Sequence, residues 1–409
     1  MSREGIIIGG GASGLTAAIS AARRGARVTV LEHMPRVGKK ILSTGNGKCN
    51  MTNLFLDASC YRCSCPEFPM EVIRRFPPEE TIRFFRQLGI LTTDRNGYVY
   101  PASGQAQTVL DALREEAEML GVTVVLDCHV RTLRKKGQRF YADTDHGNFS
   151  GDFLILAAGS MAAPSTGSDG SGYELSRVFG HRILTPLPAL VQLCCQGGFF
   201  RSVAGVRTEA SVSLYSGGQL LASDRGELQL TDYGISGIPV FQVSRYASQA
   251  LHRRKQVTAV LDFLPSMDHH ELFELLREQK KYLSGRQAGT YLNGIFHKKL
   301  AALFLKEAGI RPETPVEQLA KQELAALCRI IKEFSVPVVK TNSFAQAQVC
   351  AGGVDTSEVD PETMESRLTE ELYFAGEILD VDGICGGYNL QWAWSSGYLA
   401  GKQAAGKGI

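Results

Sequence analysis

The sequence lacks the features that mark a membrane protein, a secreted protein or a nucleic-acid-binding protein. It has no unbroken apolar run near the ~18 residues of a transmembrane helix. Its first apolar run, Ile6 to Ile8, is followed at once by glycines, which is unlike a signal peptide. The formal net charge of the 409 residues is only +2, too weak to predict a polyanionic partner. These absences predict a cytoplasmic protein that binds neither membranes nor nucleic acids.

Patterns for a metal site or a common hydrolytic site are also missing. Cys60, Cys63 and Cys65 form a C-x-x-C-x-C cluster, but no fourth ligand follows at a recognisable spacing. No P-loop or Ser-His-Asp arrangement stands out. We therefore predict no metal site and expect the ten cysteines to be reduced thiols. Any role of the three clustered cysteines stays open.

What the chain has in excess is glycine, and its distribution is uneven. There are 43 glycines, whereas an average usage of about 7% would give about 29. Positions 5–47 hold nine and positions 352–408 hold ten, but positions 241–350 hold only four. The two chain ends are therefore predicted to carry loops in which the backbone approaches a ligand.

The first 32 residues read as a complete βαβ unit. Gly5–Ile8 predicts a buried strand, Leu15–Arg24 a helix closed by Gly25, and Arg27–Glu32 a second strand. Between the first strand and the helix lies a G-x-G-x-x-G motif, formed by Gly9, Gly11 and Gly14.

Each residue of this motif has a distinct expected role. Gly9 allows the tight turn, Gly11 lets the backbone approach a pyrophosphate, and Gly14 lets the helix pack on the strand. Glu32, at the end of the second strand, can accept hydrogen bonds from ribose hydroxyls and disfavours a 2′-phosphate. The unit predicts dinucleotide binding but does not distinguish NAD from FAD. No second G-x-G-x-x-G follows a strand, so no separate nicotinamide site is visible.

Two further loops suit a long cofactor. Residues 38–50 alternate glycines with hydroxyl, amide and cationic groups, which suits contacts to phosphate or to a ring edge, although a polar surface loop is the alternative. Within this loop Cys49 could be a redox thiol, but no C-x-x-C partner supports that. Residues 376–389 precede a final predicted helix, Asn389–Ala405, and form either a second anion-binding helix start or a glycine-capped turn.

The α/β patterns at both ends enclose a different middle. Short β-like runs begin near Leu187, and the sequence from Pro239 to about Lys332 reads as helical. We predict an α/β fold: a Rossmann-like FAD-binding domain interrupted by a β-barrel-like insert with a helical subdomain. The expected boundaries are 1–188 and 340–409 for the FAD-binding domain, 189–265 and 325–339 for the insert, and 266–324 for the helical subdomain.

The chain resembles the BaiN/RdsA-type flavoproteins, also described as aminoacetone-oxidase-like, among the NAD(P)/FAD-dependent oxidoreductases. The resemblance covers essentially the whole chain in order, and its most specific parts are the loop from Gly38 to Asn53 and the segment from Tyr373 to Gly397. Other parts are Gly9 to Glu32, 157–173, 231–237 and 363–366. Two positions depart from the usual pattern: Ala158 stands where such proteins often have Thr, and Glu377 where many flavoproteins have Asp.

The resemblance implies a glutathione-reductase-like FAD domain and a set of cofactor contacts. The pyrophosphate and ribose would be held by Gly9, Gly11, Ala12, Ser13, Gly14 and Glu32. The flavin would lie along Lys40, Ser43, Asn46, Gly47, Cys49 and Asn50, and the adenine would meet the backbone of Val130. Gly376, Glu377, Asn389 and Leu390 would close over the ribitol and ring, and Ala158 and Gly159 complete the set.

The resemblance also implies a reaction. One branch of the family is similar to a 3-dehydro-bile-acid Δ4,6-reductase, so the favoured expectation is reduction of an enone in a hydrophobic small molecule by hydride transfer through flavin N5. Tyr388, Lys48 and Asp382 are the candidate catalytic groups, and NAD(P)H is a possible electron donor. Alternatives are an amine oxidase or dehydrogenase, an RNA-modifying flavoenzyme, or a flavin-binding protein without turnover. The sequence does not predict the oligomeric state.

Overall fold

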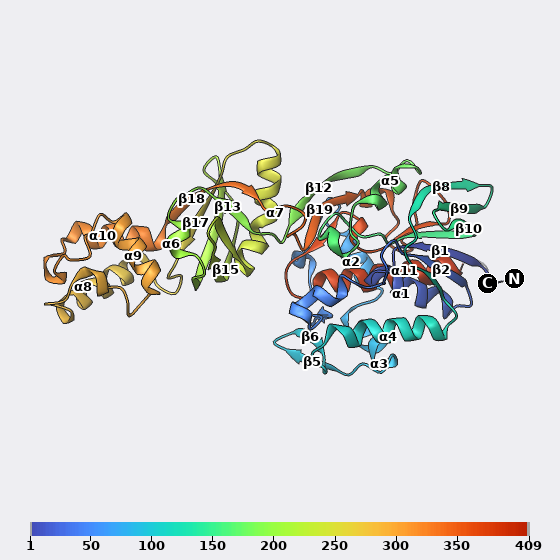
Figure 1. Ribbon diagram of the computed structural model, residues 1–409, viewed down its shortest axis with the longest axis horizontal. Helices are drawn as coiled ribbons and strands as arrows, with labels where there is room; N and C mark the ends of the chain where they lie inside the picture. Colours follow the sequence, from blue (N-terminus) through green and yellow to red (C-terminus); the bar gives the residue numbers. More distant parts are fainter. Residues whose placement is uncertain (1, 407–409) are drawn as a thin grey trace. The chain divides into compact units, whose positions relative to one another are not determined.

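The computed structural model describes residues 2–406 and divides into two compact units, coloured along the chain in Figure 1. Unit 1 consists of Met1–Leu187 and Ala347–Ile409, and unit 2 consists of Pro188–Gln346. Both chain ends therefore belong to one unit, and the middle of the chain forms the other. Over the described residues, no helix has the length and apolarity needed to cross a membrane.

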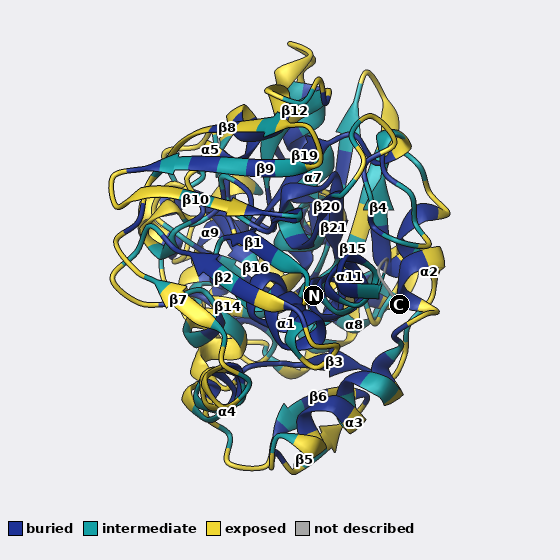
Figure 2. Cartoon of the chain, turned by 90° about the vertical axis from the view of Figure 1, so that its right-hand side faces the viewer, coloured by how far each residue is buried: buried dark blue, intermediate teal, exposed yellow. Residues whose placement is uncertain are grey.

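Unit 1 is built on a parallel five-stranded sheet with the order β20-β11-β1-β2-β7. Ile7 of β1 pairs with Val30 of β2 on one side and with Ile155 of β11 on the other, and Ile155 pairs in turn with Tyr373 of β20. The central strands are buried on both faces (Figure 2), which explains their continuous apolar sequences. The strands are β1 (Glu4–Ile8), β2 (Arg27–Leu31), β7 (Thr123–Val125), β11 (Phe153–Leu156) and β20 (Leu372–Phe374).

Helices and four small sheets surround this parallel sheet. The helices of unit 1 are α1 (Ala12–Ala22), α2 (Phe68–Ile73), α3 (Pro78–Gln87), α4 (Ala106–Met119), α5 (Ser171–Arg177) and α11 (Tyr388–Gly406). The small sheets have the orders β10-β9-β8, β12-β19, β21-β4 and β3-β6-β5. Their strands are β3 (Thr52–Asn53), β4 (Tyr61–Cys63), β5 (Thr92–Arg95), β6 (Tyr98–Pro101), β8 (Val130–Lys136), β9 (Arg139–Thr144), β10 (Gly147–Gly151), β12 (Ile183–Ala189), β19 (Val349–Val354) and β21 (Val381–Gly383).

The first and last helices of unit 1 cross at very short range. A Cβ atom at Gly397 of α11 would overlap the carbonyl oxygen of Ser13, and one at Gly401 would overlap the carbonyl oxygen of Ala17. Only glycine at these two positions allows the backbones of α1 and α11 to approach this closely. The crossing joins segments that lie at opposite ends of the sequence.

Unit 2 combines a closed barrel with a helical subdomain. The barrel has the strand order β13-β16-β15-β14-β17-β18, and one continuous apolar core extends from the barrel into the helices. The strands are β13 (Leu193–Cys195), β14 (Arg207–Ser216), β15 (Gln219–Leu230), β16 (Gly234–Gly237), β17 (Val257–Asp262) and β18 (Phe334–Thr341). The helices are α6 (Phe200–Val203), α7 (Ile238–His252), α8 (His269–Tyr282), α9 (Lys298–Glu307) and α10 (Lys321–Lys332).

The predicted fold class is confirmed: a Rossmann-type α/β unit carries a barrel-forming insert. One part of the prediction is wrong. The stretch from Pro239 to Lys332 is not helical throughout, because β17 lies within it and pairs with β14 and β18. The residues of β17 alternate between buried and half-buried positions, which is the period-2 pattern of a strand with one face in the core.

We expect Gly401→Ala to lower the free energy of unfolding of the protein by about 1–3 kcal/mol, because the added methyl group overlaps the backbone of α1. Chemical denaturation followed by circular dichroism measures this change. Gly406→Ala, near the end of the same helix, is the matched control. Its Cβ would meet nothing closer than Arg24 at 3.6 Å, so the better helix propensity of alanine should leave the stability unchanged or raised. Equal effects of both substitutions would contradict this interpretation of the crossing.

Candidate functional site

The three motif glycines occupy three different environments. Gly9 has a φ of +100° and a Cβ there would lie 2.5 Å from the carbonyl oxygen of Ala157, so both its conformation and its surroundings require glycine. A Cβ at Gly14 would overlap the carbonyl oxygen of Gly9. Gly11 differs, because a Cβ there would have no neighbour within 4 Å. The fold therefore needs Gly9 and Gly14, whereas Gly11 borders open space at the start of α1.

Glu32 follows β2 and is held beside this space. Its Oε2 accepts a hydrogen bond from the backbone N–H of Gly10 at 2.7 Å, and its Oε1 accepts one from the N–H of Met34 at 2.8 Å. The residue is only 8% exposed. A carboxylate has about four acceptor sites, so Glu32 can still accept hydrogen bonds from the hydroxyls of a ribose.

The loop after β2 is ordered by a few buried anchors. Val37, Ile41, Cys49 and Met51 belong to an apolar cluster that also contains residues of α1, α4 and α11. Between the anchors the chain turns sharply through positive φ values at Gly45, Asn46, Gly47 and Cys49. This arrangement exposes the predicted cofactor residues Ser43, Asn46 and Gly47 together with Lys48.

Cys49 is an anchor of the loop. The residue is fully buried, and burial raises the pKa of its thiol to about 12. A thiol with this pKa does not form the thiolate that redox chemistry requires at neutral pH. The alternative of a redox-active Cys49 therefore has no support in its environment.

Asn50 presents an unsatisfied acceptor. The side chain is 8% exposed, and its Oδ1 has no hydrogen-bond partner among the described residues. Gly387 lies against it, because a Cβ at this glycine would be 2.9 Å from the Asn50 Oδ1 and 2.7 Å from the Thr52 carbonyl oxygen. Buried polar atoms are normally paired, so Asn50 fits a site that a hydrogen-bond donor of a ligand completes.

The two tryptophans of the chain, both on α11, hold the predicted cofactor loops in place. The Trp392 Nε1–H donates to the carbonyl oxygen of Gly376 at 3.0 Å, and the Trp394 Nε1–H donates to that of Met51 at 2.9 Å. Both rings are fully buried. The N–H of Gly376 donates to the Ser396 Oγ at 2.9 Å. One helix therefore supports both the loop around Gly376 and the end of the 38–50 loop.

An ion pair joins two of the predicted cofactor residues. The Lys40 Nζ lies 2.6 Å from the Glu377 Oε2, and the side chains are 24% and 17% exposed. The Ser160 hydroxyl donates to the same carboxylate oxygen at 3.3 Å, and the Lys40 Nζ donates to the carbonyl oxygen of Ala162 at 3.4 Å. Lys40 and Glu377, far apart in sequence, thus lie together in the structure.

The three candidate catalytic side chains lie in different environments. The Tyr388 hydroxyl donates to the carbonyl oxygen of Phe55 at 2.7 Å, and burial raises the pKa of this hydroxyl. Asp382, on β21, is 3% exposed, whereas Lys48 is exposed. Only Lys48 among the three therefore has its charged group in solvent. No catalytic assignment is tested by these positions, and all three stay predictions.

The remaining predicted cofactor residues lie in turns or at the ends of helices and strands, and two of them make hydrogen bonds to the backbone. The Asn389 side chain accepts from the N–H of Gly383 at 2.7 Å and donates to its carbonyl oxygen at 2.9 Å, so it closes the 383–388 turn. The Ser13 hydroxyl donates to the carbonyl oxygen of Ala375 at 3.3 Å. Ala12 lies in the first turn of α1, Val130 begins β8, Ala158 and Gly159 follow β11, and Leu390 lies in the first turn of α11.

Sequence reasoning missed several residues that build the site. Trp392, Trp394, Ser160 and Ser396 were not selected. The first three donate to a backbone or side-chain oxygen of a predicted cofactor loop, and the Ser396 hydroxyl accepts a hydrogen bond from the N–H of Gly376. Their partners are distant in sequence, so spacing alone carried no signal. The rarity of tryptophan in the chain was the available clue.

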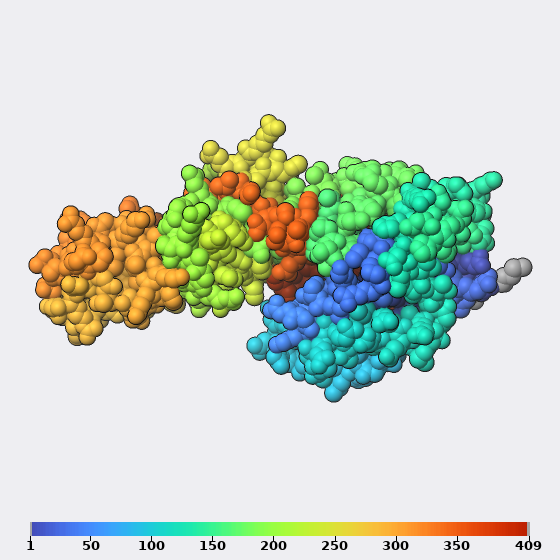
Figure 3. Space-filling model, in the orientation of Figure 1, coloured from blue at the N-terminus to red at the C-terminus, as the bar shows by residue number. Residues whose placement is uncertain are grey.

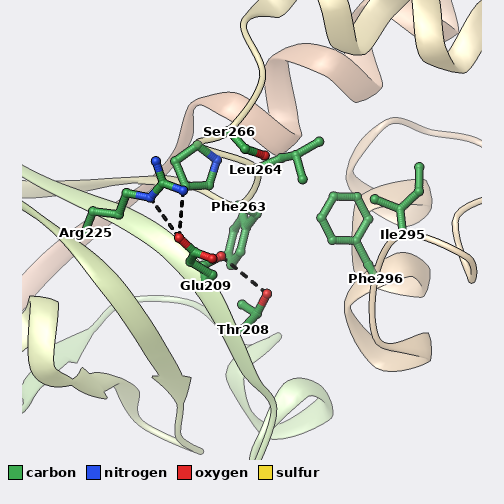
Figure 4. A pocket seen from close by; sticks show the side chains of 9 residues that line it. Thr208, Glu209, Arg225, Phe263, Leu264, Ser266, Ile295 and Phe296 are labelled. Atoms are coloured by element: carbon green, nitrogen blue, oxygen red, sulfur yellow. Dashed lines mark hydrogen bonds and ion pairs between the residues drawn. The ribbon is translucent and has the colours of Figure 1, made fainter. Parts of the chain in front are cut away.

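A pocket of about 210 Å³ in unit 2 was not predicted. Figure 4 shows Arg225, Glu209 and the ring of Phe263 at one side of it and Ile295 and the ring of Phe296 at the other. Arg225 is already paired with Glu209 at 2.7 Å, so its charge is compensated within the pocket wall. Across residues 2–406, no three His, Cys, Asp or Glu side chains come together as a metal site would require.

The geometry of unit 1 fits a dinucleotide such as FAD. Open space at Gly11, the remaining acceptor capacity of Glu32 and the unpaired Oδ1 of Asn50 all lie on loops that α1 and α11 hold together. With FAD bound, the start of α1 would hold the pyrophosphate, Glu32 the ribose and the 38–50 loop the flavin.

Comparisons with known proteins match this chain over almost its whole length. The family model described as "HI0933-like protein Rossmann domain" matches residues 3–403. The 3-dehydro-bile acid delta(4,6)-reductase of Clostridium scindens is 46% identical over 407 residues, 99% of each chain. The ribosomal RNA dihydrouridine synthase of Haemophilus influenzae is 30% identical over 402 residues, 97% of this chain and 96% of the relative.

Among solved structures, a 3-ketosteroid-Δ4-(5α)-dehydrogenase from Rhodococcus jostii in complex with 4-androstene-3,17-dione matches at 16% identity. The match has a TM-score of 0.46 and covers 98% of this chain and 97% of that chain.

We expect Gly11→Val to abolish flavin retention without unfolding the protein. The backbone of Gly11 is extended (φ −78°), a conformation that valine adopts, and the new side chain would enter open space that the pyrophosphate needs. Visible absorbance of the purified variant and its thermal unfolding test both parts. Gly14→Ala is the contrasting variant, because its methyl group overlaps Gly9 and should lower stability as well. A Gly11→Val protein that purifies with full flavin would refute the assignment of the space at Gly11 to the pyrophosphate.

We expect Glu377→Gln to lower the free energy of unfolding by about 1–3 kcal/mol, because Lys40 loses its charged partner in a half-buried site. Lys40→Met combined with Glu377→Gln should cost less than the sum of the two single changes. Denaturation curves of the four proteins give the coupling energy. Glu227→Gln is the control, since its pair with Arg207 is about 60% exposed and should matter little. Additive effects at Lys40 and Glu377 would contradict the pairing.

Proposed function

The chain belongs to the HI0933-like family of Rossmann-domain proteins, and from this premise we propose that it reduces a carbon–carbon double bond conjugated to a carbonyl group in a hydrophobic small molecule. It is an oxidoreductase with a Rossmann-type FAD-binding domain. The observation that carries the proposal is the 46% identity, over 99% of both chains, to a relative named as a delta(4,6)-reductase of a 3-dehydro-bile acid. A 3-oxo steroid or a similar enone is therefore the proposed substrate.

The proposed chemistry divides between cofactor and protein. When bound, FAD supplies a hydride from N5 of its reduced ring. The protein must orient the enone, stabilise negative charge on its carbonyl oxygen and deliver a proton to the α-carbon. NADH or NADPH is the proposed source of electrons.

Lys48 is the best placed of the three candidate groups for the carbonyl oxygen. Its ammonium group is exposed on the loop that also carries Ser43 and Asn46, so an incoming substrate can reach it. Tyr388 would have to give up its hydrogen bond to Phe55 before it could donate its proton elsewhere. Asp382 is buried on β21. We therefore propose Lys48 as the electrostatic partner of the carbonyl oxygen.

A second candidate is reduction of a uridine base in RNA, and the dihydrouridine synthase relatives favour it. The two reactions share their chemistry, because the double bond of uridine that is lost in dihydrouridine is also conjugated to a carbonyl. The net charge of +2 speaks against a large phosphate-binding surface. An amine oxidase activity or a flavin-binding role without turnover has no such specific support.

Anaerobic spectroscopy tests the proposal. We expect NADH or NADPH to bleach the flavin of the purified protein, and a Δ4 3-oxo steroid then to restore its colour and gain two hydrogens by mass spectrometry. Bleaching by an amine, with no response to NADH, NADPH or enones, would overturn the reductase proposal. Dihydrouridine formed in ribosomal RNA, with no steroid reduced, would decide for the second candidate.

A further inference from the structure

Three large apolar side chains lie exposed together on unit 1. Leu54, Phe55 and Tyr98 are 46%, 71% and 42% exposed. They lie at one end of the sheet β3-β6-β5, where Asn53 pairs with Tyr98 and the N–H of Leu54 donates to the carbonyl oxygen of Gly97 at 2.9 Å. We call these three side chains the platform. Single exposed apolar residues are common on protein surfaces, whereas a cluster of them calls for an explanation.

The same sheet contacts both predicted flavin loops. The ring of Tyr98 lies 2.9 Å from the position that a Cβ of Gly386 would take, and the Asn53 Nδ2 donates to the carbonyl oxygen of Gly386 at 3.0 Å. On the next outward-facing position of β6, the Tyr100 ring lies 3.5 Å from the Cβ position of Gly45. In Figure 3 the surfaces of residues near 50 (blue) and near 100 (cyan) adjoin. The platform is therefore continuous with the loops that we assign to the flavin.

Phe55 is tied to the same place through its backbone. Its carbonyl oxygen accepts the hydrogen bond from the Tyr388 hydroxyl, and its N–H donates to the Asn53 Oδ1 at 2.9 Å. Its ring lies over Gly97, where a Cβ would overlap it. The backbone that carries the exposed ring is thus held by hydrogen bonds on both sides, which favours a preorganised binding surface.

We propose that the platform binds the apolar body of the small-molecule substrate while its conjugated carbonyl end lies at the flavin loops. This inference rests on the proposed function and adds the residues that select the substrate. Burial of apolar surface against these side chains favours a large hydrophobic ring system over a small polar enone. Leu54, Phe55 and Tyr98 are thereby specificity-determining residues.

The composition of the platform favours this occupant over an RNA base. Single-stranded RNA binds to aromatic rings along a positively charged track, but Leu54 is aliphatic. The charged residues beside the platform carry both signs. The Asp94 carboxylate accepts a hydrogen bond from the N–H of Gly97 at 2.9 Å, and Arg95 pairs with Tyr98 across the strands. A mixed aliphatic and aromatic surface without an excess of positive charge suits a neutral fused-ring skeleton.

Three single variants, Leu54→Ser, Phe55→Ser and Tyr98→Ser, test the proposal in the flavin-loaded protein. We expect each to raise the KM for a Δ4 3-oxo steroid by about tenfold and to leave kcat/KM for 2-cyclohexen-1-one unchanged, because this small enone does not reach the platform. Tyr282→Ser is the matched control, since Tyr282 on α8 is 74% exposed and belongs to unit 2. Visible absorbance verifies the flavin content of each variant. If Tyr98→Ser loses its flavin, the Leu54→Ser and Phe55→Ser variants still test the proposal.

A binding measurement separates this inference from the proposed function. A saturated 3-oxo steroid has no carbon–carbon double bond to reduce, and its binding is followed through the flavin absorbance. Binding by the natural protein that is lost in the three variants supports the platform even if no enone is reduced. Equal losses for the steroid and for cyclohexenone, unchanged steroid kinetics, or platform variants that lose only the binding of a uridine oligonucleotide would each overturn it.

Discussion

The close crossing of α1 and α11 is the constraint on which the arrangement of unit 1 depends. Gly397 and Gly401 lie on the backbone of α1 with no room for a side chain. Because of this contact, the helix that begins at the G-x-G-x-x-G turn and the last helix of the chain form one support. Gly14 tightens the same assembly, since it packs directly on the backbone of Gly9. The nucleotide-binding turn is therefore positioned by residues almost four hundred positions away.

The crossing also explains how two loops from opposite ends of the sequence come to form one site. α11 carries the indoles of Trp392 and Trp394, which fix the Gly376 loop and the end of the 38–50 loop by hydrogen bonds to their carbonyl oxygens. Lys40 and Glu377 then pair across the two loops. Buried anchors hold the backbone of the 38–50 loop, and a polar atom that keeps no partner within the protein is then available to a ligand. Asn50, with its unpaired Oδ1, is the clearest example.

Local patterns in the sequence were sufficient for the parts of the fold that depend on neighbours. The βαβ unit and the final helix follow from apolar periodicity and from glycines at turns. β17 was missed because it lies between helices in a glycine-poor stretch, although its alternation was readable. In the site, the glycine turn and Glu32 could be found from spacing. The partners of Tyr388 and Lys40 could not, because this hydrogen bond and this ion pair depend on how distant segments pack.

The two kinds of relative indicate where substrate selection must reside. A bile-acid reductase and ribosomal RNA dihydrouridine synthases match this chain over nearly its whole length, so both must accommodate their substrates on the same framework. In the proposed site the glycine turn and Glu32 would hold the dinucleotide and the tryptophans would support its loops, and none of these residues would distinguish a steroid from a base. The choice between a steroid and a base therefore has to come from side chains that border the dinucleotide loops but are not part of them. The exposed Leu54, Phe55 and Tyr98 are the candidates, because they border these loops, while the sheet beneath them is also held by the Asn53 side chain at Gly386 and by the Tyr100 ring at Gly45.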